Sequence, residues 1–308
     1  MTTRIALVSA REALALDLDM APLSAALRQA GVEVETPFWD DPAVDWGRYA
    51  AAVLRSTWDY VERIDEFLPW AERCALRTRL LNPPDVVRWN TDKHYLADLA
   101  RAGIPVVPTR FVEPGAAAAG QIEQFLDGGA DALSIGSSQP FTEFVVKPSI
   151  GAGSKDTARY RRDDFARATD HLERLLAQGR SAMLQPYLVR VDEQGETALI
   201  YLGGEFSHAI RKGPLLRAGA ALVEGLFAPE QITAREAQPD ELDLARNAYA
   251  AIGSSRPVYA RIDVIRSAED RPLVLELELT EPSLFFEHAP GSAGRFARAL
   301  LERPITAG

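Results

Sequence analysis

Tyr259-Ala-Arg-Ile-Asp-Val-Ile265 and Leu273-Val-Leu-Glu-Leu-Glu-Leu279 are two apolar runs with polar residues at alternate positions. Because successive side chains of a strand point to opposite sides, this alternation predicts two neighbouring β-strands with one polar face. The polar face would carry Arg261, Asp263, Glu276 and Glu278. The apolar face would carry Ile262, Val264, Leu275 and Leu277. Carboxylates this close repel one another unless a cation lies between them, and Mg²⁺ suits such a group. A solvated strand face whose acids pair with Arg261 is the alternative.

A glycine-rich segment upstream, Phe144-Val-Val-Lys-Pro-Ser-Ile-Gly-Ala-Gly-Ser154, predicts a strand followed by a turn. Backbone N–H groups in such a turn can bind phosphate oxygens, and Lys147 would add a compact positive charge. The segment is not a P-loop, because the lysine precedes the glycines, and it is not a dinucleotide-binding fingerprint. Taken alone, it is equally typical of a hairpin turn with a surface lysine.

The N-terminal region predicts a β-α-β unit. Ile5–Val8 is a short apolar run, a helix follows from Pro22 to Ala30, and strands follow at residues 32–34 and 51–54. This order indicates an α/β fold with a parallel sheet, in which ligands bind beyond the carboxyl ends of the strands. The segment Arg55-Ser-Thr-Trp-Asp-Tyr60 lies at such an end. Its arginine and aspartate suit the carboxylate and ammonium groups of a small zwitterion, although the segment is also typical of a helix cap.

The rest of the chain alternates between helices and strands after a break at Leu81-Asn-Pro-Pro84. The helices are expected at residues 91–102, 116–125, 164–176, 240–252 and 294–301. Strands are expected at 106–111, 144–147 and 183–185, with a hairpin over 196–210 that turns at Gly203-Gly204. A long loop is expected from Arg211 to Phe227.

The composition sets limits on partners and location. The 308 residues include 44 Asp and Glu against 34 Lys and Arg, and the net charge of −10 argues against a nucleic-acid groove. The single Cys74 and the lack of a long apolar stretch predict a cytoplasmic protein without a membrane span. Arginine supplies 30 of the 34 basic residues, so each lysine that remains is a candidate for a specific role. These lysines are Lys93, Lys147, Lys155 and Lys212.

Five motifs occur in an order that resembles the ATP-grasp superfamily of carboxylate–amine ligases. They are Asn90-Thr-Asp-Lys93, Lys147-Pro-Ser with its glycines, Leu184-Gln-Pro-Tyr-Leu188, Arg261-Ile-Asp263 and Glu276-Leu-Glu278. The resemblance covers residues 85 to 300 and implies a two-lobed ATP-grasp fold behind an N-terminal Rossmann-like domain. The expected divisions are an N-terminal substrate domain (1–84), a central lobe with the glycine-rich lid (85–187) and a C-terminal lobe with the metal site (188–308).

The resemblance implies where ATP binds. Lys93 and Lys147 would hold the α- and β-phosphates, and Asp192 would bind the ribose hydroxyls. The residues of the lid would be Gly151, Ala152, Gly153 and Ser154. Adenine would meet Gln185, Pro186, Tyr187 and Leu188, although the family often has Glu at the first of these positions.

The resemblance also implies the catalytic groups. Asp263, Glu276 and Glu278 would bind Mg²⁺, and two ions would offset the extra charge of Glu278, where many relatives have Asn. Arg261 would face the transferred phosphoryl group, and Lys212 would reach it from the long loop. The expected chemistry is activation of a carboxylate as an acyl phosphate, followed by attack of a nitrogen.

Three further segments resemble the subgroup that contains D-cycloserine synthetase, the O-ureido-D-serine cyclo-ligase. They are Ser56-Thr-Trp-Asp-Tyr60, Ala209-Ile-Arg-Lys-Gly-Pro214 and Leu279-Thr-Glu-Pro-Ser-Leu284. This likeness implies a small amino-acid-like substrate that is cyclised for antibiotic biosynthesis, and relatives are often homodimers. The expected substrate contacts are Arg55, Ser56, Thr57, Trp58, Asp59, Arg11 and Glu281. A ligase that joins two amino acids and a non-catalytic ATP-binding protein are the alternatives.

Overall fold

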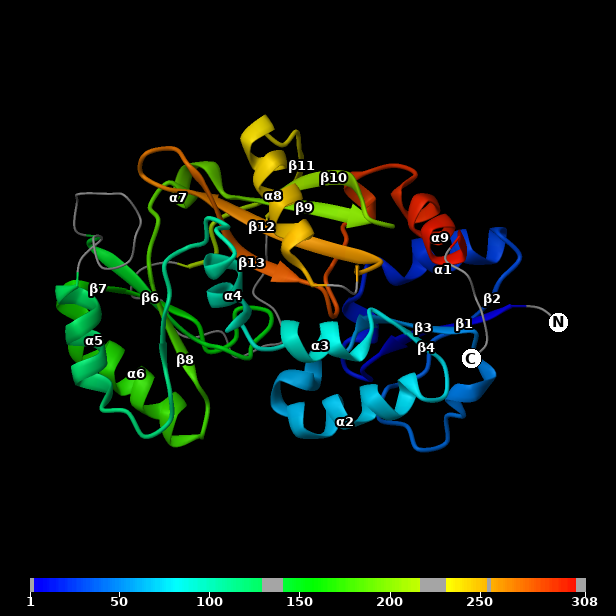
Figure 1. The fold of residues 1–308 in the computed structure, drawn as a ribbon, viewed down its shortest axis with the longest axis horizontal. Helices are drawn as coiled ribbons and strands as arrows, with labels where there is room; N and C mark the ends of the chain where they lie inside the picture. Colours follow the sequence, from blue (N-terminus) through cyan, green and yellow to red (C-terminus); the bar gives the residue numbers. More distant parts are fainter. Residues whose placement is uncertain (1–2, 129–140, 217–230, 254–255, 303–308) are drawn as a thin grey trace.

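The computed structural model describes residues 3–128, 141–216, 231–253 and 256–302, which form three sheets covered by helices (Figure 1). The predicted mixture of α and β structure is confirmed. Within the described residues, every helix is too short or too polar to cross a membrane.

The N-terminal sheet is parallel, as its β-α-β pattern predicted. Its strands are β1 (Arg4–Ser9), β2 (Glu33–Glu35), β3 (Ala51–Ser56) and β4 (Arg79–Leu81), in the order β2-β1-β3-β4. The side chains of β1 alternate between two cores. Ile5 and Leu7 pack with α1 (Met20–Gln29), whereas Ala6 and Val8 pack with α2 (Ile64–Ala75). Both faces of the sheet are therefore buried, which explains its continuous apolar strands.

A second sheet is antiparallel and carries the glycine-rich turn. Its strands are β5 (Arg110–Val112), β8 (Ala182–Pro186), β6 (Glu143–Pro148) and β7 (Ala158–Arg161), in the order β5-β8-β6-β7. Two helices, α5 (Ala118–Asp127) and α6 (Phe165–Ala177), pack with it around Phe144 and Val146. Lys147, the next residue of β6 with the opposite side-chain direction, lines the cavity described below.

The third sheet is antiparallel and contains the two strands of alternating residues. Its order is β11 (Ile232–Arg235), β10 (Glu205–Lys212), β9 (Glu196–Leu202), β12 (Tyr259–Arg266) and β13 (Pro272–Glu278). One face packs with three helices, α3 (Pro84–Asn90), α4 (Tyr95–Arg101) and α8 (Pro239–Ala251), around Leu199, Ile262 and Leu277. The short helix α7 (Val191–Gln194) precedes β9. Several side chains of the opposite face, among them Arg261 of β12 and Glu276 and Glu278 of β13, line a cavity.

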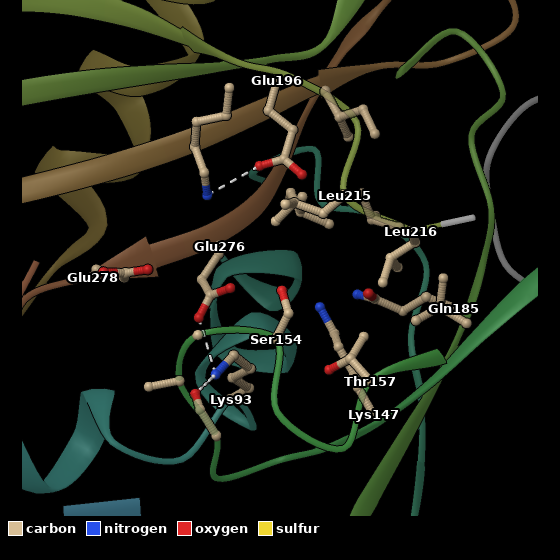
Figure 2. A pocket seen from close by; sticks show the side chains of 18 of the residues that line it. Lys93, Lys147, Ser154, Thr157, Gln185, Glu196, Leu215, Leu216, Glu276 and Glu278 are labelled. Carbon is tan, nitrogen blue, oxygen red and sulfur yellow. Dashed lines mark hydrogen bonds and ion pairs between the residues drawn. The ribbon is translucent and has the colours of Figure 1, made fainter. Parts of the chain in front are cut away.

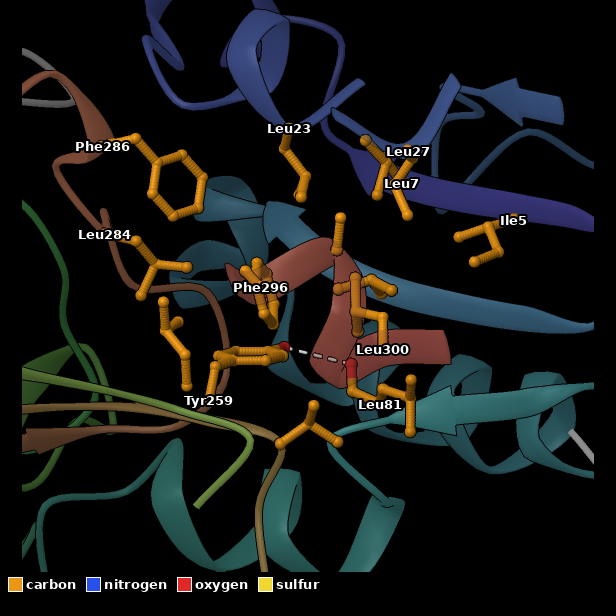
Figure 3. Packing of buried hydrophobic residues seen from close by; sticks show 14 of the residues in the cluster. Ile5, Leu7, Leu23, Leu27, Leu81, Tyr259, Leu284, Phe286, Phe296 and Leu300 are labelled. Carbon is orange, nitrogen blue, oxygen red and sulfur yellow. Dashed lines mark hydrogen bonds between the residues drawn. The ribbon is translucent and has the colours of Figure 1, made fainter. Parts of the chain in front are cut away.

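The C-terminal helix α9 (Ser292–Glu302) joins the N-terminal sheet to the third sheet. Figure 3 shows Phe296 and Leu300 of α9 in one cluster with Leu23 and Leu27 of α1 and with Tyr259 of β12. The Tyr259 hydroxyl donates to the Leu81 carbonyl at 3.0 Å, next to the junction predicted near residue 84. This shared core fixes the N-terminal domain against the strands that carry Arg261 and Asp263.

A β-bulge alters the predicted alternation of β13. Asp263 pairs with Glu276, but the next residue of β12, Val264, pairs with Val274, so Leu275 is the extra residue. Leu275 and Glu276 consequently both line the cavity. The prediction that Leu275 belongs to the apolar face was wrong, because strict alternation does not allow for an inserted residue.

Three other expectations have clear outcomes. The hairpin turning at Gly203-Gly204 is confirmed by the antiparallel pairing of β9 with β10. The helix expected over 91–102 is shorter in the structure, where α4 covers Tyr95–Arg101, and Lys93 lies in the connection from α3, a helix that was not predicted. Lys212 ends strand β10, so its assignment to a loop was wrong, and residues 217–227 of that expected loop lie outside the described residues.

Candidate functional site

A cavity lies where the second sheet meets the third. Its lining includes Lys147 from β6, Gln185 from β8 and Arg261 from β12, and the N-terminal domain contributes Trp58 and Tyr60. Segments that are far apart in the sequence thus meet around one space. A concave site of apolar walls with a few convergent charges is the usual form of a small-molecule site.

One part of the cavity is apolar. Its walls come from β6, β12, β13, α7 and the segments before β5 and after β8. The residues are Val107, Val145, Tyr187, Leu188, Val191, Ile265 and Leu275. Gln185 lines this part, is buried, and donates from Nε2 to Thr109 Oγ1 at 2.8 Å. The bulge contributes Leu275 to these walls. This part of the cavity suits a flat aromatic base.

The other part of the cavity is lined by charged groups (Figure 2). Lys93 Nζ lies 2.9 Å from a Glu276 carboxylate oxygen and donates to the Gly151 carbonyl at 2.7 Å. The break between α3 and α4 allows this contact, because the Lys93 backbone N–H donates to Ser149 rather than continuing a helix. The Lys147 side chain enters the same space, and the structure gives its ammonium no ion pair within the described residues.

A second charged group surrounds Asp263. Arg261 donates to both Asp263 oxygens at 2.9 and 3.0 Å, and it also pairs with Glu278. Lys212 Nζ lies 3.1 Å from Asp263 and 3.3 Å from Glu196. Asp263 is 1% exposed and is absent from the cavity lining, so it mainly holds the two cations in place.

The charges of this region shift each other's titration. Burial lowers the pKa of Lys147, the nearby Lys93 lowers it as well, and Glu276 opposes the shift. Burial alone would raise the pKa of Glu276, but Lys93 and Lys147 bring it below its ordinary value. For Glu278, burial dominates over the attraction of Arg261 and raises the pKa to about 7. A cation bound beside Glu278 would favour the ionised form of this carboxyl group.

The carboxylates fit Mg²⁺ in chemistry, although they are held by cations of the chain. In the described residues, no three His, Cys, Asp or Glu side chains are grouped as a metal site. Glu276 and Glu278 both line the cavity with oxygen donors, and Mg²⁺ needs only one or two carboxylates when phosphate oxygens complete its shell. Binding there requires Lys93 and Arg261 to share these carboxylates with the ion.

The glycine-rich turn borders the cavity from β6 to β7. All four residues predicted for the lid line it, namely Gly151, Ala152, Gly153 and Ser154. Gly153 and Ser154 both have φ of 62°, a left-handed conformation that glycine adopts without strain. Lys155 of this turn pairs with Glu62 of the N-terminal domain. Two contacts thus hold the turn in place. Lys93 donates to the Gly151 carbonyl, and Lys155 pairs with Glu62.

The structure separates the predicted adenine and ribose residues. Gln185, Pro186, Tyr187 and Leu188 all line the cavity, whereas Asp192 does not. Asp192 is exposed and interacts with Arg159 and the Tyr187 hydroxyl. Glu196 lines the cavity in its place and was missed, although it begins the predicted hairpin and follows Asp192 by four residues.

The segment 55–59 contributes less to the cavity than its composition suggests. Trp58 lines it, and its Nε1 donates to the Glu281 carbonyl at 3.1 Å. Asp59 accepts from Trp39 Nε1 at 2.8 Å and pairs with Arg63 outside the lining. Thr57 is buried, and Ser56 shares a hydrogen bond of 2.8 Å with the hydroxyl of Ser9.

The two arginines expected to bind substrate are also outside the lining. Arg55 is 0% exposed, donates to the Pro282 carbonyl at 3.1 Å and lies 3.6 Å from Asp19. Arg11 is exposed, and its guanidinium lies over the Phe38 ring. Arg55 therefore supports the backbone that follows β13, whereas Arg11 belongs to the surface.

Residues 281–286 complete the cavity, and the sequence analysis predicted only one of the lining residues in this segment. Glu281 was expected and lines the cavity, as do Tyr60, the last residue of the expected segment 55–60, and the unpredicted Ser283 and Phe285. Asp19 holds this segment by accepting from three successive backbone N–H groups, those of Leu284, Phe285 and Phe286. No periodic pattern in residues 281–286 signals this contact, because it depends on a partner more than 260 positions away.

Comparisons with solved structures agree with this architecture. The fold is similar to D-alanine–D-alanine ligase from Bacillus anthracis, with a TM-score of 0.66 and 15% identity, covering 97% of this chain and 95% of that chain. It is also similar to the ligase PsnB solved with a precursor variant, Mg and ADP, with a TM-score of 0.64, 19% identity and 98% coverage of both chains. The fold is that of the ATP-grasp ligases.

A narrower group is defined by sequence. The family model described as the N-terminal domain of D-cycloserine synthetase DcsG matches residues 5–82. Cycloserine biosynthesis protein DcsG of Streptomyces lavendulae is 43% identical over 304 residues, covering 97% of this chain and 98% of the relative. The crystal structure of D-cycloserine synthetase DcsG covers 98% of this chain and 100% of that chain, with a TM-score of 0.89 and 42% identity. This chain belongs to the D-cycloserine synthetase family of ATP-grasp ligases.

Proposed function

We propose that this protein is an ATP-dependent cyclo-ligase that converts O-ureido-D-serine to D-cycloserine in antibiotic biosynthesis. The observation that carries the proposal is the 43% identity to a cycloserine biosynthesis protein over nearly the whole of both chains. The cavity supports it, because apolar walls, lysines and carboxylates meet in one space that also receives the N-terminal domain.

ATP would lie across the junction of the two antiparallel sheets. Adenine would occupy the apolar part, next to Gln185 and the segment from Pro186 to Leu188. The phosphates would meet Lys93, Lys147 and the turn 151–154, where backbone N–H groups and ammonium groups offset their charge. Glu196, which lines the cavity, is better placed than Asp192 to accept hydrogen bonds from the ribose.

The metal site we propose consists of Asp263, Glu276 and Glu278, with two Mg²⁺ ions. Bound Mg²⁺ would neutralise phosphate charge during transfer. Glu276 and Glu278 provide the oxygens that face the cavity, while Asp263 supports the site through Arg261 and Lys212. Arg261 and Lys212 would stabilise the charge of the transferred phosphoryl group.

The reaction would proceed in three steps. A substrate carboxylate oxygen attacks the γ-phosphorus of ATP and ADP leaves, giving an acyl phosphate. The ureido-oxy nitrogen then attacks the acyl carbon, inorganic phosphate leaves, and a five-membered ring closes. Water removes the carbamoyl group as carbon dioxide and ammonia. Because both reacting groups belong to one molecule, the chain needs to position only a single substrate for ring closure.

We also propose the domain divisions 1–84, 85–187 and 188–308. The end of β4 at Leu81 and the family match to residue 82 support the first boundary. The second boundary does not separate two independent cores, because α3 and α4 of the central lobe pack on the third sheet, which belongs to the C-terminal lobe. The proposed partners are ATP and the amino-acid-like substrate in the cytoplasm, and a homodimer stays a prediction.

Incubation with ATP, Mg²⁺ and O-ureido-D-serine tests the function directly. We expect mass spectrometry to detect D-cycloserine, with one ADP and one phosphate for each ring. Phosphate release that requires a second amino acid would contradict cyclisation and support a ligase that joins two molecules. Omitting Mg²⁺ should abolish turnover, and chelation followed by restoring the ion is the control.

A further inference from the structure

Among the described residues, four glutamates line the cavity, and three of them form an ion pair with a lysine or an arginine. Glu196 has Lys212 at 3.3 Å, Glu276 has Lys93 at 2.9 Å, and Glu278 has Arg261. Glu281 is 7% exposed, and no lysine, arginine or histidine within the described residues forms an ion pair with it. A buried carboxylate without a cation is costly, so the group either takes up a proton or is neutralised by a positively charged ligand.

The surroundings of Glu281 hold it in a defined place. Its carbonyl accepts from Trp58 Nε1 at 3.1 Å, and Arg55 Nη2 donates to the next carbonyl, that of Pro282, at 3.1 Å. The Tyr60 hydroxyl interacts with the Glu281 side chain. The N-terminal domain thus orients a carboxyl group toward the space where the domain meets the third sheet.

Burial raises the pKa of Glu281 to about 8, and the neighbouring Glu278 raises it as well, while Tyr60 and Lys93 oppose the shift. This agrees with the geometry, because the carboxylate form is under-compensated in the protein alone. An ammonium group placed beside it would favour ionisation.

The charged groups that the sequence assigned to a zwitterion are elsewhere. Asp59 already pairs with Arg63 and Trp39, and Arg55 is covered by the loop that it supports. Among the described residues that line the cavity, Arg261 is the arginine, and a substrate carboxylate or acyl phosphate would share it with Asp263 and Glu278. In the described part of the chain, the cavity therefore brings together a carboxyl group without an ion pair and an arginine, which suits a small molecule that bears both charges.

We propose that Glu281 binds the α-ammonium group of the amino-acid substrate, and that Tyr60 positions the Glu281 carboxylate for this contact. This inference rests on the proposed function and assigns it a specificity-determining residue. The α-ammonium group takes no part in ring closure, so Glu281 acts by recognition and not by proton transfer to the reacting atoms.

A substrate pair isolates the contact. O-ureido-D-serine is compared with its des-amino analogue, 3-(ureidooxy)propanoic acid, which keeps both reacting groups. We expect the wild type to prefer the amino compound by about 100-fold or more in kcat/KM, since unpaired buried polar groups discriminate strongly. Glu281→Gln should reduce this preference to about tenfold or less by losing activity on the amino compound alone.

Matched variants separate recognition from folding. Glu72→Gln removes a carboxylate from an exposed ion pair on α2 and should retain the wild-type preference. Tyr60→Phe should lower the preference by about threefold to tenfold without changing the KM for ATP. If Glu281→Gln weakens both compounds equally, or if only Asp59→Asn loses the preference, the assignment of Glu281 is wrong.

Binding measurements keep the two proposals distinguishable. Both compounds are titrated by calorimetry into the enzyme with Mg²⁺ and a non-hydrolysable ATP analogue. Turnover without discrimination would support the cyclo-ligase activity and contradict the role of Glu281. Discrimination in binding without ring formation would support Glu281 and contradict the activity. A wild type that neither binds nor converts the amino compound would contradict both.

Discussion

The part of the cavity proposed to bind the nucleotide (the nucleotide part) and the part proposed to bind the amino-acid substrate (the substrate part) are built in different ways. The nucleotide part is made from strands and a glycine-rich turn, whose side-chain directions follow from local sequence. The substrate part is made where residues 281–286 meet the N-terminal domain, and its contacts join positions more than 220 residues apart. A period of two predicts the first kind of site, but it says nothing about the second.

Substitution of Arg55 should cause the largest loss of stability. It also tests whether the segment 55–59 binds a ligand or supports the backbone that follows β13. Arg55→Met would leave Asp19 buried without its cation and remove the donor to Pro282. We expect the free energy of unfolding to fall by about 3 to 5 kcal/mol, measured by urea denaturation. Arg77→Met, which removes an exposed partner of Asp45, is the control and should cost less than about 1 kcal/mol. Normal stability with loss of substrate binding would place Arg55 in the substrate site instead.

Lys147 tests the nucleotide part. Lys147→Ala should lower kcat/KM for ATP by roughly 100- to 1000-fold, because a preorganised charge on the phosphates is lost. Lys147→Arg should still weaken ATP binding by about tenfold, since a planar guanidinium does not replace a compact ammonium in this half-buried position. Phosphate-release assays and ATP titrations provide the measurements. Full activity of the arginine variant would show that charge alone is sufficient there.

The acid that binds ribose can be identified by two isosteric variants. Glu196→Gln should raise the KM for ATP by about tenfold, because its carboxylate faces the cavity. Asp192→Asn should raise it less than about twofold, since that side chain is exposed and pairs with Arg159. The opposite order of effects would show that the cavity rearranges when ATP binds.

The ion pair between the lid and the N-terminal domain should have the smallest effect on ATP binding. Both Lys155 and Glu62 are partly exposed, and such pairs contribute less than about 1 kcal/mol. Lys155→Ala should therefore change the KM for ATP by about threefold or less, and the change should shrink in high salt. A loss as large as that of Lys147→Ala would mean that Lys155 contacts phosphate directly.

The sequence predicted most of the nucleotide part because its residues lie in regular elements. Arg261, Glu276 and Lys147 point toward the cavity for the simple reason that side chains alternate along a strand. The bulge at Leu275 defeated this rule, since one inserted residue reverses the alternation.

The residues of the substrate part could not be predicted from local sequence patterns. Arg55 is of a residue type that often binds a carboxylate, and only its full burial and its hydrogen bond to the Pro282 carbonyl indicate a supporting role. The sequence does not distinguish Glu281 from the other acids. The structure does, because the other three glutamates known to line the cavity each pair with a lysine or an arginine. Long-range contacts of this kind are determined by the fold as a whole.

A crystal structure of the enzyme with O-ureido-D-serine, Mg²⁺ and a non-hydrolysable ATP analogue tests the account most directly. We expect the adenine between Tyr187 and Leu275, the phosphates beside Lys93 and Lys147, and the α-ammonium group about 3 Å from Glu281. An ammonium group bound by Asp59, with the substrate carboxylate on Arg55, would contradict the division of the cavity described above.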